Sequence, residues 1–184
     1  LFISGNAYSG GKTKFSCVRY GNVIGSRGSI VETLLNMPKN QKVRITDERM
    51  TRFWLMIERS FELVLFALEN MAGGEIFIPK VPSMKIVDMV DIIIPGAEKE
   101  IIGIRPGEKL HETLLTCEES RHAVEFGEYF VVLPEHKEIF NADNFKKYIN
   151  EGKVLPQDYC FASDTNNDWL SEESFKEIIG NLKI

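Results

Sequence analysis

Two stretches of the chain combine residue types that could hold a nucleotide. Residues 19–28 read RYGNVIGSRG, so glycines, an asparagine, a serine and an arginine follow a short apolar segment. Glycines leave backbone N–H groups open to close approach by a nucleotide, and Arg27 could add a phosphate contact. An ordinary turn, in which Gly25 and Gly28 serve only to reach positive φ, explains the same residues. The stretch lacks the G-x-G-x-x-G pattern, and taken alone it favours the ordinary turn.

Residues 103–112, GIRPGEKLHE, form the second stretch. Pro106 and Gly107 are typical of a type II turn, which would hold Arg105 and Glu108 on the same side of a tight bend. An arginine there can donate paired hydrogen bonds to a diphosphate, and a carboxylate can accept from sugar hydroxyls. The alternative is two solvated charges at a helix start, where the helix dipole favours Glu108. The residues alone leave both interpretations open.

A third stretch, residues 45–54 (ITDERMTRFW), places basic groups beside aromatic ones. Thr46, Arg49 and Arg52 could surround a base and its phosphates together with Phe53 and Trp54. More often, such a pattern is a charged loop that leads into buried aromatic residues, and we favour that interpretation.

Hydrophobic periodicity predicts the elements that would position these stretches. The pattern alternates between strands and helices, which favours an α/β architecture. Expected strands are 15–20, 43–54 with a turn at 46–47, 75–80, 100–104 and 127–135; expected helices are 29–37, 55–74, 81–96 and 171–182, with a further helix opening after the turn at 105–108. Ser29, Ser83 and Ser171 are the expected N-caps, and Glu32 would complete a capping box with Ser29.

Composition excludes several functions. The net charge is −5 and no basic run stands out, which argues against nucleic acid as a partner. The apolar runs are far shorter than the roughly 20 residues that span a membrane. Cys17, Cys117 and Cys160 contain no C-x-x-C pair, so we expect reduced thiols rather than a disulfide. The three histidines lack metal-ligand spacing, and we expect no metal site.

Taken together, the motifs resemble one family, the inverting UDP-N-acetylglucosamine 4,6-dehydratases. These are extended short-chain dehydrogenases that make nucleotide-sugar precursors of pseudaminic acid and related surface glycans. The resemblance rests on RYGNVIGSRGS, ITDERMTRFW, GGEIFIPKVPSMKIVDMV, IIGIRPGEKLHE and NNDWL, in the family's order and approximate spacing. It covers essentially the whole chain. PKVPSMK together with IRPGEKLHE is specific, whereas many epimerases and dehydratases share RYGN.

The resemblance implies the C-terminal part of such an enzyme. Residues 1–31 would end the NAD(P)-binding Rossmann domain, and 32–116 would form a smaller substrate-binding lobe, interleaved with the last Rossmann strand and helix near 75–95. Residues 117–184 would be a C-terminal extension. In the family the Gly-rich NADP loop and the catalytic Tyr-x-x-x-Lys pair precede the equivalent of Leu1. We therefore expect no catalytic residue here, an inactive chain by itself, and an unpaired sheet edge.

The resemblance also implies which residues touch ligands. The NADP-lining stretch would be Val23, Ile24, Gly25, Ser26 and Arg27, and the substrate contacts would be Asn22, Ile30, Thr46, Arg105 and Glu108. The intact enzyme would be a cytoplasmic hydro-lyase and a homo-oligomer acting on UDP-N-acetylglucosamine or a similar nucleotide sugar. Hydride would leave C4, water would be lost across C5 and C6, and hydride would return to C6 with inversion at C5. A related UDP-sugar 4-epimerase, a retaining dehydratase or a non-catalytic nucleotide-sugar-binding module are the alternatives.

Overall fold

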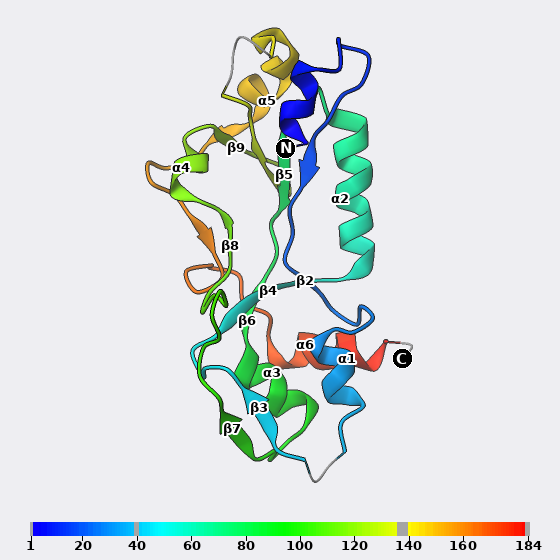
Figure 1. Ribbon diagram of the computed structural model, residues 1–184, viewed down its shortest axis with the longest axis vertical. Helices are drawn as coiled ribbons and strands as arrows, with labels where there is room; N and C mark the ends of the chain where they lie inside the picture. The colour runs from blue at the N-terminus through cyan, green and yellow to red at the C-terminus, as the bar shows by residue number, and fades with distance from the viewer. Residues whose placement is uncertain (1, 39–40, 136–139, 183–184) are drawn as a thin grey trace. The chain divides into compact units, whose positions relative to one another are not determined.

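The computed structural model describes residues 2–38, 41–135 and 140–182. It divides the chain into two compact units, each assembled from three separate segments (Figure 1). The first unit comprises residues 1–20, 58–80 and 113–161, and the second comprises 21–57, 81–112 and 162–184. Both units mix helices with strands, which confirms the predicted α/β class. The boundaries expected near residues 31 and 116, between the end of the Rossmann domain, the substrate-binding lobe and the C-terminal extension, remain a prediction.

The first unit is built on a five-stranded sheet in the order β1-β5-β10-β9-β11. Strand β1 runs parallel to β5, and the remaining neighbours are antiparallel. The elements of this unit are η1 (Ile3–Ala7), β1 (Cys17–Val18), α2 (Ile57–Asn70), β5 (Ile76–Pro79), β8 (Thr113–Leu115), α4 (Cys117–Ser120), β9 (Ala123–Phe126), β10 (Tyr129–Val132), η2 (Ala142–Phe145), α5 (Lys146–Glu151) and β11 (Lys153–Val154), with β12 (Phe161–Ala162) at the boundary between segments of the two units.

Helix α2, which was expected over residues 55–74, covers this sheet. Its residues Leu63 and Ala67 are buried in one cluster with Phe77 of β5 and Val131 of β10. The buried carboxylate of Glu75 then closes the turn from α2 into β5. It accepts hydrogen bonds from the N–H groups of residues 72 and 73, at 2.6 and 2.8 Å, and from the hydroxyl of residue 16 at 2.6 Å. The last turn of α2 is thereby fixed to β5 and to the segment that enters β1.

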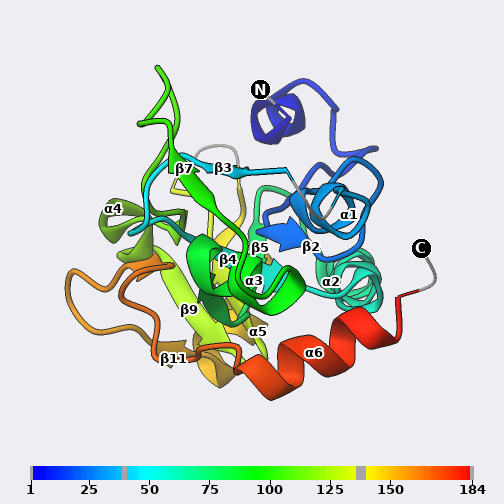
Figure 2. The ribbon, with the colours of Figure 1, turned by 90° about the horizontal axis from the view of Figure 1, so that it is seen from below.

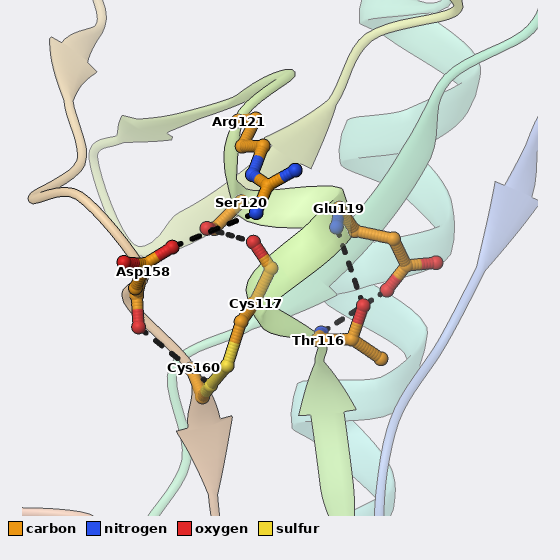
Figure 3. The surroundings of a disulfide bond; sticks show 7 residues. All are labelled: Thr116, Cys117, Glu119, Ser120, Arg121, Asp158 and Cys160. Atoms are coloured by element: carbon orange, nitrogen blue, oxygen red, sulfur yellow. Dashed lines mark hydrogen bonds and ion pairs between the residues drawn. A yellow bond between two sulfur atoms is a disulfide. The ribbon is translucent and has the colours of Figure 1, made fainter.

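The expectation of three reduced thiols is wrong for two of them. Cys117 and Cys160 form a disulfide, with Cα atoms 4.7 Å apart and 43 positions between them in sequence (Figure 3). Cys117 begins α4 directly after the capping residue Thr116. Beside the disulfide, Arg121 and Asp158 form an ion pair with an N···O distance of 3.7 Å. The spacing of the cysteines could not reveal this pair, because the fold alone brings the two segments together.

Reduction of this disulfide is expected to lower the melting temperature of the chain. Closing a loop of this length restricts the unfolded chain by about 4 kcal/mol in the chain-entropy model. Thermal melts with and without dithiothreitol test this, with Cys117→Ser as the variant that should no longer respond to the reductant. Cys17→Ser is the matched control, because Cys17 is the free cysteine, and it should respond as the wild type does. Equal melting with and without reductant in the wild type would contradict the expectation.

The second unit has its own hydrophobic core. Strand β2 runs parallel to β4 and β6 antiparallel to it, while β3 pairs with β7 in parallel. Helix α3 lies between α1 and α6 and contacts both (Figure 2). The elements are β2 (Asn22–Val23), α1 (Ile30–Leu35), β3 (Val43–Ile45), β4 (Thr51–Leu55), β6 (Ser83–Lys85), α3 (Ile86–Ile93), β7 (Lys99–Ile101) and α6 (Glu172–Gly180). Within the described parts of the chain, no helix is long and apolar enough to cross a membrane.

Two element predictions in this chain are wrong. Ser83 was expected to cap a helix, but it begins β6, is fully buried, and α3 starts only at Ile86. Its backbone groups bond instead to residues 168 and 170, far along the chain. Likewise, residues 113–115 form strand β8 rather than a helix after the turn. In both places contacts distant in sequence override the local helical pattern.

Candidate functional site

The predicted type II turn is present at residues 105–108. Gly107 has φ +80°, and the Glu108 N–H donates to the carbonyl of Arg105 at 3.0 Å. The Glu108 carboxylate also accepts from the Arg105 N–H at 3.2 Å. The positive φ is the conformation that a type II turn requires of its third residue, which explains the glycine. The side chain of Arg105 is exposed, so its guanidinium is accessible to a ligand.

Thr46 lies beside this turn, 62 positions earlier in sequence. Its hydroxyl donates to the Glu108 carboxylate at 3.1 Å. Strands β3 and β7 bring the two together, because Thr46 directly follows β3 and residue 102, which follows β7, bonds to the carbonyl of Ile45 at 2.9 Å. Three predicted substrate residues from two separate motifs therefore form one cluster. It offers a guanidinium, a carboxylate and a hydroxyl, a set that suits a diphosphate with neighbouring sugar hydroxyls.

Arg52 supports the backbone that follows the turn. Its guanidinium donates to the carbonyls of Leu110 and Lys109, at 3.0 and 2.8 Å. Phe53 and Trp54 are buried at 0 and 1% exposure. The favoured interpretation of this stretch, a charged loop leading into core aromatic residues, is confirmed. Arg52 was not predicted to have this supporting role.

A second set of polar contacts ties the same backbone to β4. The Thr51 hydroxyl bonds to the His111 ring nitrogen Nδ1 at 2.8 Å and to the Ser163 hydroxyl at 2.7 Å. The hydroxyl of Ser163 in turn accepts from the Glu112 N–H at 2.9 Å, and the Glu112 carboxylate accepts from the Phe53 N–H at 3.2 Å. These contacts fix residues 109–112 and hence the turn before them. No sequence signal pointed to Ser163, which is 112 positions from Thr51.

Burial raises the pKa of the Glu112 carboxyl above its ordinary value of 4.5. Because the folded protein then binds the proton more tightly than the unfolded chain, the stability that this group contributes is present at low pH and is lost as pH rises through the raised pKa. Glu112→Gln keeps the acceptor for the Phe53 N–H but carries no charge. Its melting temperature relative to wild type should therefore rise as pH increases from ~4 to ~8. Glu177→Gln, an exposed change on α6, is the matched control, and identical pH profiles for the two variants would contradict the prediction.

The predicted cofactor stretch lies at the start of the second unit. Val23 belongs to β2, and Ile24 donates its N–H to the carbonyl of Leu55 at 2.9 Å while its side chain is buried in the core. Ile24 therefore has both its side chain and its N–H engaged in the fold. Ser26 and Arg27 are exposed, so these two residues offer polar groups at the surface. Asn22, the predicted substrate contact in β2, is exposed as well.

Different structural constraints explain why glycine occupies three positions in this region. At Gly21, a Cβ would lie 2.5 Å from the Cβ of Phe53 and 2.7 Å from its carbonyl oxygen. Gly25 has φ +71° and faces the Leu182 side chain, which a Cβ would approach to 2.6 Å. Packing against Phe53 thus explains Gly21, and the positive φ explains Gly25. Gly28 has φ +74° and would meet nothing within 4 Å, so the turn is open there. Ser26 and Arg27 beside it are exposed.

Helix α1 begins beside this open turn. Ser29 is its N-cap, as predicted, and accepts from the Glu32 N–H at 3.2 Å. The second half of the expected capping box is wrong, because the Glu32 carboxylate takes the N–H of Gly28 rather than that of Ser29. This contact fixes the turn at Gly28. Ile30, the predicted substrate contact, is the first residue of α1 and is 39% exposed.

The larger hollows of the second unit do not include the predicted residues. One, of about 640 Å³, is lined by Glu48, Arg49, Thr51, Lys85, Val87, His111, Asp164 and Trp169. Arg49 is paired there with Asp47 at 2.8 Å, and this contact lowers the pKa of Asp47 to about 2. Another, of about 620 Å³, lies between the ends of α1 and α3. None of the ten predicted residues lines either of these two hollows.

Comparisons with known proteins show one matching family model and several similar proteins. A family model described as polysaccharide biosynthesis protein matches residues 1–134. Two inverting UDP-N-acetylglucosamine 4,6-dehydratases of Campylobacter jejuni are 40 and 41% identical over 100% of the chain and 56% of their own length. A UDP-glucose 4-epimerase of Rickettsia felis is 35% identical over 95% of the chain and 51% of its own length. The structure of Pen from Bacillus thuringiensis matches with a TM-score of 0.80 and 31% identity, over 98% of this chain and 54% of that one. The chain thus spans about half the length of these relatives.

Proposed function

Because the chain belongs to the family of polysaccharide biosynthesis proteins, we propose that it is the nucleotide-sugar-binding part of a UDP-N-acetylglucosamine 4,6-dehydratase that inverts C5. The observation that carries the proposal is the cluster formed by Arg105 and Glu108 on one turn and Thr46 beside it. In the dehydratases that the motifs resemble, the matching positions contact the substrate. The chain is 40 and 41% identical to two curated inverting dehydratases over its whole length.

Each residue of the cluster has a separate role in this proposal. The exposed guanidinium of Arg105 binds the diphosphate, where a planar fork of donors can form paired charge-assisted hydrogen bonds. Each oxygen of the Glu108 carboxylate accepts one hydrogen bond, from Thr46 or from the Arg105 N–H, and a remaining lone pair accepts from a sugar hydroxyl. Asn22 and Ile30 contact the sugar nucleotide from β2 and the first turn of α1. The work of these residues is to position the sugar, which lowers the barrier by holding the reacting carbons in place.

The cofactor of the intact enzyme is NADP in this proposal. When bound, it accepts the hydride from C4 of the sugar and returns it at C6. The exposed Ser26 and Arg27, together with the open turn at Gly28, would lie against it. Val23 and Gly25 shape this turn from within, and Ile24 anchors it in the core. The proton chemistry belongs to residues that this chain does not contain, so the chain alone is a positioning part of a hydro-lyase.

The intact protein is proposed to be a cytoplasmic homo-oligomer whose partner is UDP-N-acetylglucosamine or a similar nucleotide sugar. Disulfides are rare in the cytoplasm, where glutathione keeps thiols reduced. In that compartment the pair of Cys117 and Cys160 would be kept as a dithiol, and the reductant-dependent melts described above measure how much stability its reduction costs.

Product stereochemistry tests the proposal. A hybrid protein is made in which the portion of the Campylobacter jejuni dehydratase that this chain does not match is fused before Leu1. Incubated with UDP-N-acetylglucosamine and NADP in deuterated water, the hybrid should form a 4-keto-6-deoxy sugar, with deuterium at C5 and inverted configuration there. The chain without the fused portion should form none. A C4 epimer would instead support the epimerase alternative, and retention at C5 would support a retaining dehydratase.

A further inference from the structure

We propose that Ser163 is a positioning residue for the nucleotide-sugar site and sets substrate affinity through the backbone that leaves the turn at Arg105–Glu108. Ser163 is fully buried, so it cannot contact the substrate itself. Its hydroxyl accepts from the Glu112 N–H at 2.9 Å and donates to the Thr51 carbonyl at 3.2 Å. It also shares a bond of 2.7 Å with the Thr51 hydroxyl. One small side chain thereby joins strand β4 to the segment that follows the turn.

The backbone of Ser163 strengthens this connection. Its N–H donates to the Glu112 carbonyl at 2.8 Å, so Glu112 is bonded to Ser163 through both its N–H and its carbonyl. Between Glu112 and the turn, the Leu110 carbonyl accepts from the Thr51 N–H at 3.2 Å. The few residues after Glu108 are therefore held to β4 and to Ser163, and they carry the turn with them.

Residues 163–170, called the C-terminal strap here, hold Ser163 at a fixed position. The side-chain amide of Asn166 donates to the Ser83 hydroxyl at 3.1 Å. The backbone N–H and carbonyl of Ser83 bond to two further residues of the strap, at 2.9 Å each. Ser83 begins β6 and is itself fully buried. The strap is thus anchored to β6 by contacts that do not involve the turn, and Ser163 provides a fixed reference for the backbone after it.

Loss of the Ser163 hydroxyl would release this backbone. The Glu112 N–H would lose its acceptor, and an unpaired donor inside the fold is costly, so the segment would shift to find another partner. The turn would then occupy positions in which Thr46 and Glu108 do not meet. A ligand that binds only the assembled site has its apparent affinity reduced by the fraction of molecules in which the site is assembled. Once the sugar is bound, the same groups hold it, so the chemical step is unchanged.

Steady-state kinetics of the hybrid test the proposal. Ser163→Ala should raise KM for UDP-N-acetylglucosamine about fivefold or more and leave kcat within about twofold. Ser120→Ala is the matched control, because Ser120 is 5% exposed in the first unit and its hydroxyl donates to the Cys117 carbonyl at 2.8 Å. A merely structural role would lower the amount of folded enzyme, and with it kcat, at constant KM. An unchanged KM for Ser163→Ala, or an equal rise in both variants, would overturn the proposal.

A double-mutant cycle shows whether Ser163 acts through the turn. In an Arg105→Ala background, Ser163→Ala should raise KM by a smaller factor, about twofold or less, because a group that the turn positions is gone. In an Arg44→Ala background, which changes an exposed arginine of β3, it should keep its full effect. Equal effects in the two backgrounds would contradict the positioning role. Thr51→Val removes the partner hydroxyl and carries the same expectations if Ser163→Ala does not fold.

The inference rests on the proposed function, because it concerns the same site, but the two can fail separately. Calorimetric titration of the hybrid with UDP gives dissociation constants that do not depend on turnover, and Ser163→Ala should weaken binding by the same factor as it raises KM. Weaker binding in Arg105→Ala but not in Ser163→Ala would keep the substrate site and remove the positioning role. Unchanged binding in both variants would remove both.

Discussion

Replacing Arg105 with alanine is expected to weaken binding of UDP-N-acetylglucosamine to the hybrid by about ten- to a hundredfold, or ~1.5–3 kcal/mol, as for other hydrogen bonds to charged groups. The guanidinium is exposed on the type II turn and is the cation of the cluster that Thr46 and Glu108 complete. The variant should fold normally, because the turn itself depends on backbone bonds and on Gly107. Affinity for NADP should change little, since Arg105 is assigned to the substrate.

The control for this variant is Arg44→Ala. Arg44 is an exposed arginine of β3 in the same unit and forms an ion pair with Glu100 at 3.8 Å. The Arg44→Ala substitution removes the same charge as Arg105→Ala. It should leave affinity for the nucleotide sugar within about twofold of the wild-type value, because pairs between exposed charges contribute little. Dissociation constants from calorimetric titration provide the comparison. Equal affinities of the Arg105 variant and the wild type would remove Arg105 from the site.

Gly21→Ala is expected to destabilise the chain by about 1–3 kcal/mol, the usual range for overpacking in a well-packed region. The added methyl would sit 2.5 Å from the Cβ of Phe53 and 2.7 Å from its carbonyl oxygen, and strand β4 is held in place on its other side. The backbone of β4 or of residues 20–22 must therefore shift. Because β2 begins at the next residue and pairs with β4, the pairing of Asn22 with Trp54 would weaken too.

Urea unfolding of Gly21→Ala measures this effect, with Gly180→Ala as the matched control. Gly180 ends α6, and a Cβ there would meet nothing within 4 Å, so alanine should be neutral or slightly stabilising. The alternative role for Gly21 is to leave room for a nucleotide. In that case the variant would keep its stability and lose affinity for the cofactor, which would contradict the packing explanation.

Elements with their own local signal were predictable from the sequence. Apolar residues at helical spacing predicted α2, and Ser29 and Ser171 were recognised as N-caps because a serine preceded each periodic segment. The Pro106–Gly107 pair predicted the turn, since only glycine readily reaches the φ of its third residue. Each of these features depends on residues that are close in sequence, so pattern reasoning could find them.

Features that depend on distant contacts were missed. Ser83 forms a strand because residues 168 and 170 bond to its backbone, and no local pattern records that pairing. The disulfide of Cys117 with Cys160 and the link of Thr51 to Ser163 join segments separated by 43 and 112 positions. The cluster of Thr46 with Glu108 was foreseen only through the family resemblance. The residues showed what each group could bind, but only the fold shows which groups meet.

The most direct test of the proposed substrate site is a titration of the ¹⁵N-labelled chain with UDP, followed through its amide NMR signals. We predict saturable shifts that centre on Thr46 and residues 105–108, and that disappear in Arg105→Ala but persist in Arg44→Ala. Shifts centred on the hollow lined by Lys85 and Trp169, or unchanged spectra of a folded chain at millimolar UDP, would contradict the assignment of the nucleotide-sugar site.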